Sequence, residues 1–127
     1  MNEISIVYRP LALRDKRLIA SYIAVDLASP KAALDTVSRI DDAIDLLLEV
    51  PAMGRPVNDD RLEKQGYRRL AVPHANYWVF YRFEAKERRI VIERILHQRM
   101  DIAPHMYYEM DYSEILDRKT SDDGGAR

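Results

Sequence analysis

The chain has 127 residues, no cysteine, 32% charged residues and a net charge of −1 at pH 7. This length fits one domain, because a single hydrophobic core typically serves about 100 to 200 residues. The absence of cysteine excludes a disulfide framework and a thiolate metal site. No apolar stretch is long enough to cross a membrane, and charges interrupt residues 1–30, so we expect a cytoplasmic protein without an export signal.

The charges are unevenly distributed along the chain. Residues 1–60 contain seven Lys and Arg against ten Asp and Glu, residues 61–99 contain ten against four, and residues 100–127 contain three against seven. The middle segment is the only one with a basic surplus, so it is where we expect an anionic partner to bind. A solvated charged face explains the same surplus equally well.

The N-terminal part of the chain predicts a strand and a first helix. Residues 4–8 alternate apolar and polar side chains, and Pro10 follows, which ends a strand and can open a helix. Apolar residues then recur at three- and four-residue spacing as far as Leu27, and we expect this stripe to be buried against a sheet. The members of the stripe are Leu11, Leu18, Ile19, Tyr22 and Ile23.

A second helix is predicted to begin after Ser29. Ser29 suits the N-cap, Pro30 suits the first helical position, and a single apolar stripe continues to Leu47. The stripe consists of Ala33, Val37, Ile40, Ile44 and Leu47. The helix should end before Pro51, and residues 55–65 show no periodicity, which predicts a polar loop.

The hydrophobic period changes to two from Gly66 onward. Residues 67–72, 77–83 and 89–96 are rich in aromatic and β-branched side chains and are separated by short turn-like links. This pattern predicts three antiparallel strands in a meander. The predicted order is β-α-α-β-β-β, an α+β fold in which an N-terminal strand and a helical hairpin pack on a small antiparallel sheet.

We assign residues 1–103 to this domain and residues 104–127 to a C-terminal extension. Pro104 interrupts the pattern, and the residues from 107 to 116 permit a short amphipathic helix. The polar residues after them are expected to be disordered. No repeat or low-complexity block indicates a second domain.

Three residues spaced four apart, His97, Asp101 and His105, are candidate metal ligands. On a continuous helix they would share one face, as metal ligands often do. The strand that precedes His97, together with Pro104, opposes such a helix. We therefore expect no metal and no cofactor.

His97 is the best candidate for general acid–base chemistry, because histidine titrates near neutral pH. Cleavage of RNA needs one group to accept the 2′-hydroxyl proton, another to protonate the leaving oxygen, and cations. Partners for His97 would have to come from other strands, where Tyr77 and Tyr81 lie on an apolar face that we expect to be core. Whether the chain is an enzyme is left open, with RNA cleavage as the reaction if it is one.

Five residues are candidates for binding a target: Arg55, Arg68, Arg69, His97 and Arg99. Arg55 is presented on a turn in the sequence MGRP, where bracing of the loop is the alternative role. The other arginines belong to the basic middle segment and could bind carboxylate or phosphate groups.

Five stretches, in their order and spacing, resemble the RelE/ParE superfamily of type II toxin–antitoxin toxins, also called plasmid-stabilisation proteins. They are YRPLALRDKRLIASYIA, SPKAALDTVSRIDDAIDLLLEVPAMGRP, GYRRLAV, NYWVFYRF and IVIERILHQRMDI. The resemblance covers about residues 4–102. It implies a helical hairpin on a small antiparallel sheet, and a cognate, ParD-like antitoxin whose C-terminal segment wraps the toxin.

The superfamily divides by target. RelE-like members cut mRNA in the ribosome, whereas ParE-like members poison DNA gyrase and are not known to catalyse a reaction. The sequences RILHQRMDI and MGRP are similar to the ParE branch, and His97 is followed by Gln98 and not by the tyrosine typical of the nuclease members. The resemblance thus implies a gyrase inhibitor in which His97 and Arg99 belong to a contact surface or to the structure of the strand end.

Two alternatives to gyrase inhibition stay open. One is a RelE-like, ribosome-dependent mRNA endonuclease that uses His97. The other is an inactive toxin that only binds its antitoxin and acts as a co-repressor. In each case the resemblance implies that operator DNA is reached only through the antitoxin.

Overall fold

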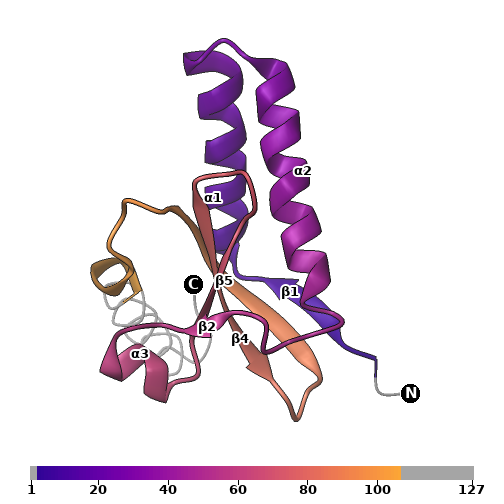
Figure 1. The fold of residues 1–127 in the computed structure, drawn as a ribbon, viewed down its shortest axis with the longest axis vertical. Helices are drawn as coiled ribbons and strands as arrows, with labels where there is room; N and C mark the ends of the chain where they lie inside the picture. The colour runs from indigo at the N-terminus through magenta and orange to yellow at the C-terminus, as the bar shows by residue number, and fades with distance from the viewer. Residues whose placement is uncertain (1–2, 107–127) are drawn as a thin grey trace, which may run out of the picture.

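The structure is a computed structural model that describes residues 3–106. The predicted helix at 107–116 and the predicted disordered tail lie outside the described residues. In chain order, the elements are β1 (Ser5–Tyr8), α1 (Pro10–Ser21), a π-helical segment η1 (Tyr22–Asp26), α2 (Pro30–Leu46), β2 (Arg55–Pro56), α3 (Asp60–Lys64), β3 (Arg68–Ala71), β4 (Tyr77–Glu84) and β5 (Arg89–His97) (Figure 1). Residues 102–106 are also helical.

The strands form one five-stranded sheet in the order β1-β5-β4-β3-β2. β3, β4 and β5 are the predicted antiparallel meander. β1 lies beside β5 in parallel, with Ser5 opposite Arg89 and Tyr8 opposite Ile92. A parallel pair needs a long connection, and α1, η1, α2, β2, α3, β3 and β4 all lie between these two strands in the sequence. The predicted α+β fold is confirmed, and the pairing of β1 makes the sheet mixed.

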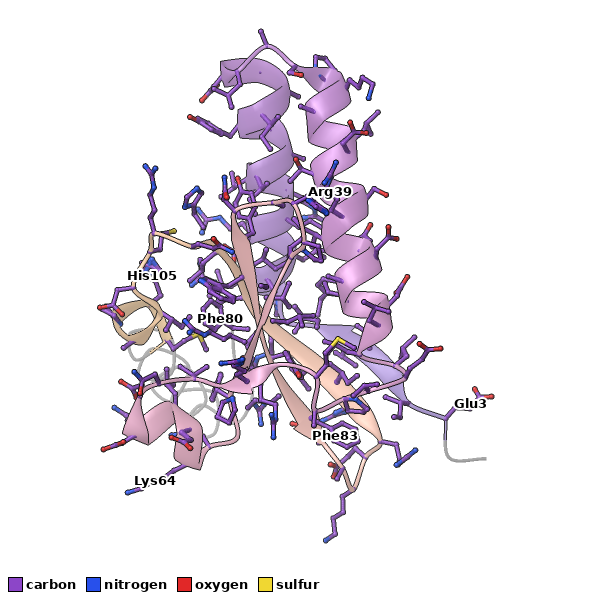
Figure 2. The ribbon with its side chains drawn as sticks, in the orientation of Figure 1. Glu3, Arg39, Lys64, Phe80, Phe83 and His105 are labelled. Atoms are coloured by element: carbon purple, nitrogen blue, oxygen red, sulfur yellow. The ribbon has the colours of Figure 1, made fainter. Side chains whose placement is uncertain are left out.

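The second helix begins as the sequence predicts. Ser29 Oγ accepts a hydrogen bond from the Ala32 amide at 3.3 Å, and Pro30 occupies the first helical position. Near the middle of α2, Arg39 points toward the turn between β3 and β4 (Figure 2), where its Nη1 atom donates to the His74 carbonyl at 3.4 Å. The first contact caps the start of α2, and the second joins its middle to the turn between β3 and β4.

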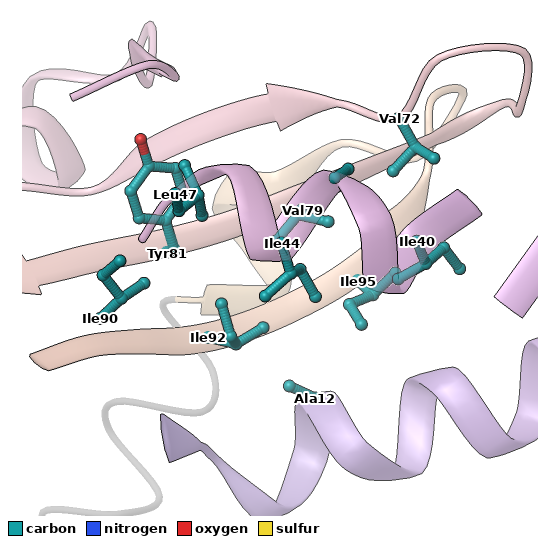
Figure 3. Close-up of a cluster of buried hydrophobic side chains, with 11 residues drawn as sticks. Ala12, Ile40, Ile44, Leu47, Val72, Val79, Tyr81, Ile90, Ile92 and Ile95 are labelled. Atoms are coloured by element: carbon teal, nitrogen blue, oxygen red, sulfur yellow. The ribbon is translucent and has the colours of Figure 1, made fainter. Parts of the chain in front are cut away.

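The main core lies between α2 and the sheet (Figure 3). Its members are Ala12, Ile40, Ala43, Ile44, Leu47, Val72, Val79, Tyr81, Ile90, Ile92 and Ile95. α2 supplies large side chains to this cluster, whereas Ala12 is the one fully buried apolar residue of α1 within it. α2 therefore supplies most of the apolar side chains that pack the hairpin on the sheet, while α1 lies close to β5.

The prediction that the whole apolar stripe of the first helix enters the core is wrong. Leu18 and Tyr22 are 55% and 51% exposed, and the buried residues of α1 are Ala12 and Asp15. Ala12 and Asp15 are the residues of α1 that face the sheet, because the Asp15 carboxylate accepts hydrogen bonds from β5. Two large apolar side chains are left on the surface as a result.

The opposite face of the sheet carries a second cluster, on which α3 and residues 102–106 pack. It consists of Val57, Leu62, Tyr67, Phe80, Leu96 and Met106. Phe80 and Leu96 alternate along their strands with residues of the main core, so they point to the other face of the sheet. The sheet is thus covered on both faces.

The prediction of an irregular loop over residues 55–65 is wrong, because β2 and α3 lie there. Asp59 caps α3 by accepting a hydrogen bond from the Leu62 amide at 3.1 Å, and Leu62 is fully buried. A helix of five residues is too short to show a hydrophobic period.

Pro104 lies in the first turn of the helical stretch 102–106 instead of breaking it. Asp101 precedes this stretch, and its Oδ1 atom accepts a hydrogen bond from the Ala103 amide at 3.3 Å. Proline is tolerated there because the first amides of a helix have no partner within the helix. Among the described residues, no helix is long and apolar enough to span a membrane.

Candidate functional site

The structure divides the five predicted target-binding residues into two groups. Arg55, Arg68 and Arg69 lie on β2 and β3, whereas His97 and Arg99 lie at the end of β5 and in the turn that follows. β4 runs between β3 and β5, so these two strands lie two strand spacings, about 10 Å, apart. The groups are also displaced along β4, since Arg68 and Arg69 lie opposite Tyr81 and Phe80 whereas His97 lies opposite Tyr77. The five residues do not form one site.

Arg55 and Arg69 lie directly opposite each other on β2 and β3. The Arg69 guanidinium stacks over the ring of Trp78, 4.3 Å from its centroid. This contact also gives Trp78 a structural role. The two positive charges on these paired strands repel each other. An anionic group bound between them would reduce this repulsion, so the pair is a candidate anion-binding site.

Arg68 points to the other face and braces a turn. Its Nη1 atom donates to the Gly54 carbonyl at 2.6 Å. Tyr81 holds the same turn, since its hydroxyl donates to the Pro51 carbonyl at 2.7 Å and accepts from the Gly54 amide at 2.8 Å. Burial raises the pKa of Tyr81 more than the Gly54 amide and Arg68 lower it. Arg68 is thus engaged in the fold, and Arg55 next to it is the exposed arginine of the MGRP sequence.

The glycine of MGRP is required by space. A Cβ atom at Gly54 would lie 2.7 Å from the Arg69 carbonyl oxygen and 2.7 Å from Tyr81 Cε1. Both distances are far below ordinary contact, and the carbonyl belongs to the backbone of a paired strand. The motif therefore serves first to pack the turn against β3 and β4, and this places Arg55 at the sheet edge.

At the end of β5, the His97 ring meets the Tyr77 ring edge-on, with 5.4 Å between ring centroids. His97 Nδ1 accepts a hydrogen bond from the Arg99 amide at 3.1 Å. The prediction that Tyr77 is a core residue holds only in part, since it packs against the main core but is half-buried. Burial, and then the nearby Tyr22, raise the pKa of Tyr77. Tyr77 is one of the possible partners of His97 that the sequence offers, but its alternation with apolar residues assigned it to the core, so their contact was not predicted.

Asp15 of α1 joins this end of β5 through three hydrogen bonds. It accepts from Arg94 Nε at 2.6 Å, from Arg94 Nη2 at 2.8 Å and from the Ile95 amide at 3.0 Å. β1 ends at Tyr8, opposite Ile92, so the carboxylate takes the place of a neighbouring strand along the next part of the β5 edge. This contact closes that edge and holds α1 in position.

A groove with a volume of about 480 Å³ lies between α1 and the end of β5. Its lining residues are Leu11, Arg14, Asp15, Leu18, Ile19, Tyr22, Tyr77, Arg94, Ile95, Leu96, His97 and Met100. Six of them are aliphatic or methionine, and two are tyrosines. The groove is thus the place where the uncovered stripe of α1 meets His97 and Tyr77.

A buried carboxylate lies on β5 before this site. Glu93 is 4% exposed, and its oxygens lie 2.8 Å from Arg82 Nε and 3.4 Å from Arg9 Nε. The Arg82 guanidinium also lies over the Tyr67 ring, 5.5 Å from its centroid. These contacts satisfy Glu93, which makes it a structural residue. Within residues 3–106, no group of three or more His, Asp or Glu side chains could hold a metal ion.

Residues 6–102 match the family model described as "ParE toxin of type II toxin-antitoxin system, parDE". The chain belongs to the ParE toxin family. This match covers most of the chain and confirms the predicted membership of the RelE/ParE superfamily. The chain is accordingly a toxin of the type II toxin–antitoxin class.

Solved structures share the fold of this ParE-family chain. A chain of the chromosomal ParDE system from P. aeruginosa has 24% sequence identity and a TM-score of 0.64, over 76% of this chain and 98% of that one. A chain of the RelBE2 toxin–antitoxin complex from Mycobacterium tuberculosis has 18% identity and a TM-score of 0.51, over 75% and 91%. The YoeB/ParE toxin from Agrobacterium tumefaciens has 16% identity and a TM-score of 0.53, over 74% and 98%. No curated protein matches the sequence significantly.

Proposed function

We propose that this chain inhibits DNA gyrase and is neutralised by a cognate antitoxin. Membership of the ParE family is the observation that carries the proposal, since the ParE branch is the one that the sequence resemblance connects with gyrase. Similarity to chains of a ParDE system and of a RelBE2 toxin–antitoxin complex supports an antitoxin partner. The proposed location is the cytoplasm, and operator DNA would be contacted through the antitoxin.

The surroundings of His97 support a binding role for this residue. Its Nδ1 atom is already engaged by the Arg99 amide. The neighbouring cation Arg94 is paired with Asp15, and the groove beside it is largely apolar. Arg14 in the groove and Arg99 after His97 are exposed cations, but an RNA strand needs cations along its whole backbone to neutralise its phosphates. This site therefore suits a protein surface better than RNA.

One observation favours a second candidate function, ribosome-dependent mRNA cleavage. The contact between His97 and Tyr77 places a histidine and a tyrosine together at the end of the last strand, as the nuclease members do. A tyrosine phenol is protonated at neutral pH, and burial raises the pKa of Tyr77 further, so it could donate a proton but not accept one. His97 would then have to be the base.

The test combines two purified reactions. The parent chain is added to DNA gyrase with plasmid DNA, and separately to translating ribosomes with a defined mRNA. We expect stalled gyrase–DNA complexes and intact mRNA. Cut mRNA without an effect on gyrase would replace the proposal with the nuclease. An inactive toxin that acts only as a co-repressor would affect neither reaction. Its expression in cells would also not slow growth.

A further inference from the structure

The turns between α2 and β2 expose four large apolar side chains. Leu46, Leu48, Val50 and Met53 are 45%, 40%, 48% and 39% exposed. The turns are compact, because the Val50 amide donates to the Leu46 carbonyl at 3.1 Å and the Met53 amide donates to the Val50 carbonyl at 3.0 Å. These residues therefore form a local apolar surface, the α2–β2 surface, which is typical of an interaction site.

Exposed carboxylates lie at the helical end of the α2–β2 surface. Asp45 and Glu49 make no ion pair with another residue in the range 3–106. The last turn of α2 contains no basic residue. Negative charge is unfavourable near the C-terminus of a helix, because the unpaired carbonyl groups give that end a partial negative charge. A cation from outside the chain would relieve this unfavourable arrangement.

Positive charge lies at the other end of the α2–β2 surface. Arg55 follows Met53 by two residues, is exposed, and lies directly opposite Arg69 on β3. Among residues 3–106, no carboxylate forms an ion pair with Arg55. An anion from outside the chain would reduce the repulsion between the two arginines. Along the chain, the surface thus presents carboxylates, then apolar side chains, then an arginine.

This order of charges is self-complementary. A two-fold axis through the apolar part would bring the carboxylates of each copy to the arginine of the other and would pack apolar side chains together. A partner of one charge sign would relieve one end of the surface and repel the other. Pairing through β2 is a poorer fit, since this strand has two residues and one of them, Pro56, has no amide to donate.

We propose that this chain forms a two-fold dimer through the α2–β2 surface, with Glu49 of each copy facing Arg55 of the other around a centre of apolar side chains. Charged pairs at the rim of an apolar centre are usual in interfaces between proteins. β4 and β3 separate β2 from β5, so the dimer leaves the strand end with His97 uncovered. The dimer goes beyond the proposed function and does not depend on it.

The experiment measures the dissociation constant of the purified full chain by sedimentation equilibrium. We expect the parent to dimerise, and Glu49→Arg and Arg55→Glu each to raise the dissociation constant about tenfold or more. The double variant with both changes should regain the parent value, because the same pairs form with their charges exchanged. Met53→Glu should also dissociate the dimer, since it places a carboxylate in the apolar centre.

The matched controls lie elsewhere on the helical hairpin. Val25 is 71% exposed, and Arg17 is exposed on α1. Val25→Glu and Arg17→Glu should therefore dimerise like the parent. Thermal melting checks the fold of every variant, and Glu49→Arg should melt no lower than the parent because it removes negative charge near the C-terminus of α2.

Three outcomes would overturn the proposal. A parent that stays monomeric at every concentration excludes the dimer, while the gyrase reaction tests the proposed function separately. A dimer that persists in all variants of the α2–β2 surface has its interface elsewhere. Folded Glu49→Arg and Arg55→Glu variants that dissociate, with no recovery in the double variant, would show that these two residues do not face each other.

Discussion

Tyr81 and Gly54 are joined by a hydrogen bond of 2.8 Å in which the Gly54 amide donates to the tyrosine hydroxyl. The same hydroxyl donates to the Pro51 carbonyl at 2.7 Å, so one buried phenol satisfies two backbone groups of the turn after α2. Gly54 lies so close to the Tyr81 ring that no side chain fits there. The turn that presents Arg55 is thus held in place by the Tyr81 side chain of β4.

Replacing Tyr81 with phenylalanine should lower the free energy of unfolding by about 1–3 kcal/mol. The change keeps the ring but leaves the Gly54 amide and the Pro51 carbonyl without their partner. Urea denaturation of the purified variants measures the difference. Tyr22→Phe is the control, since Tyr22 is half exposed and its replacement should change stability by less than about 0.5 kcal/mol. Equal stability of parent and Tyr81→Phe would show that water replaces the phenol at no cost.

Asp15→Ala should destabilise the chain strongly, by about 3–5 kcal/mol. The substitution removes the partner of Arg94, whose side chain is 13% exposed, and frees the Ile95 amide. Thermal melting checks this result. Asp35→Ala is the control, because its ion pair with Lys31 has side chains 51% and 87% exposed and should contribute less than about 1 kcal/mol. A loss no larger than that of the control would mean that Asp15 is not needed to hold α1.

Acid should reduce the stability of the chain partly through Glu84. The hydrogen bond from Arg89, aided by the charges of Arg89 and Arg82, lowers the pKa of Glu84 below its ordinary value. A group whose pKa is lower in the folded state stabilises that state above the unfolded pKa, about 4.3 for glutamate, and this contribution disappears as pH falls through the folded pKa. Between pH 6 and pH 3, the parent should therefore lose more stability than Glu84→Gln. If urea titrations show that the parent and Glu84→Gln lose the same free energy of unfolding over this pH range, Glu84 does not contribute to the acid sensitivity.

The order and type of the long elements follow from the sequence, because each has a strong local pattern. Ser29 and Pro30 mark the start of α2, and its stripe enters the core. The strands of the meander are visible as alternating aromatic and β-branched residues. The short α3 has no such pattern. Its one buried leucine, Leu62, packs on the second face of the sheet, and the sequence does not show that this face is covered.

The pairing of His97 with Tyr77 could not be predicted, because it depends on a register shift. From Tyr81 to Glu84 the partners on β5 run from Ile92 to Arg89, but beyond the irregularity at Phe80/Tyr81 the register moves by one residue. Without this shift Leu96, and not His97, would face Tyr77. A single extra residue in a strand leaves no periodic signal in the sequence, and it exchanges the residues presented at the strand end.

The burial of the α1 stripe was wrongly predicted for a different reason. Periodicity tells which residues of a helix share a face, but it does not tell what covers that face. Leu18 and Tyr22 satisfy the spacing of core residues, while the sheet accepts Ala12 and Asp15. The sequence therefore predicts correctly which residues form an apolar face, but it does not show that the sheet leaves Leu18 and Tyr22 uncovered.

The prediction that separates the two mechanisms compares substitutions at His97, Arg55 and Arg99. His97→Ala should leave growth inhibition largely intact, whereas Arg55→Glu and Arg99→Glu should reduce it. A general base would lose about 10²- to 10⁴-fold in rate on removal, enough to abolish killing by a nuclease. A contact histidine costs far less, because only a few interface side chains contribute more than about 1 kcal/mol. Arginine is the stronger anchor, since its planar fork binds a carboxylate or phosphate at two points and a glutamate there would repel the same group.

The decisive measurement for this comparison is made with purified proteins at matched folding. Arg55 and Arg99 are exposed, so their variants should melt with the parent, while His97→Ala must be checked because His97 Nδ1 accepts from the Arg99 amide and its ring contacts Tyr77. Stalled gyrase–DNA complexes that persist with His97→Ala and weaken with Arg99→Glu would support gyrase as the target. Ribosome-dependent mRNA cleavage by the parent, lost in a correctly folded His97→Ala variant, would assign His97 and Tyr77 to catalysis and overturn the choice of gyrase.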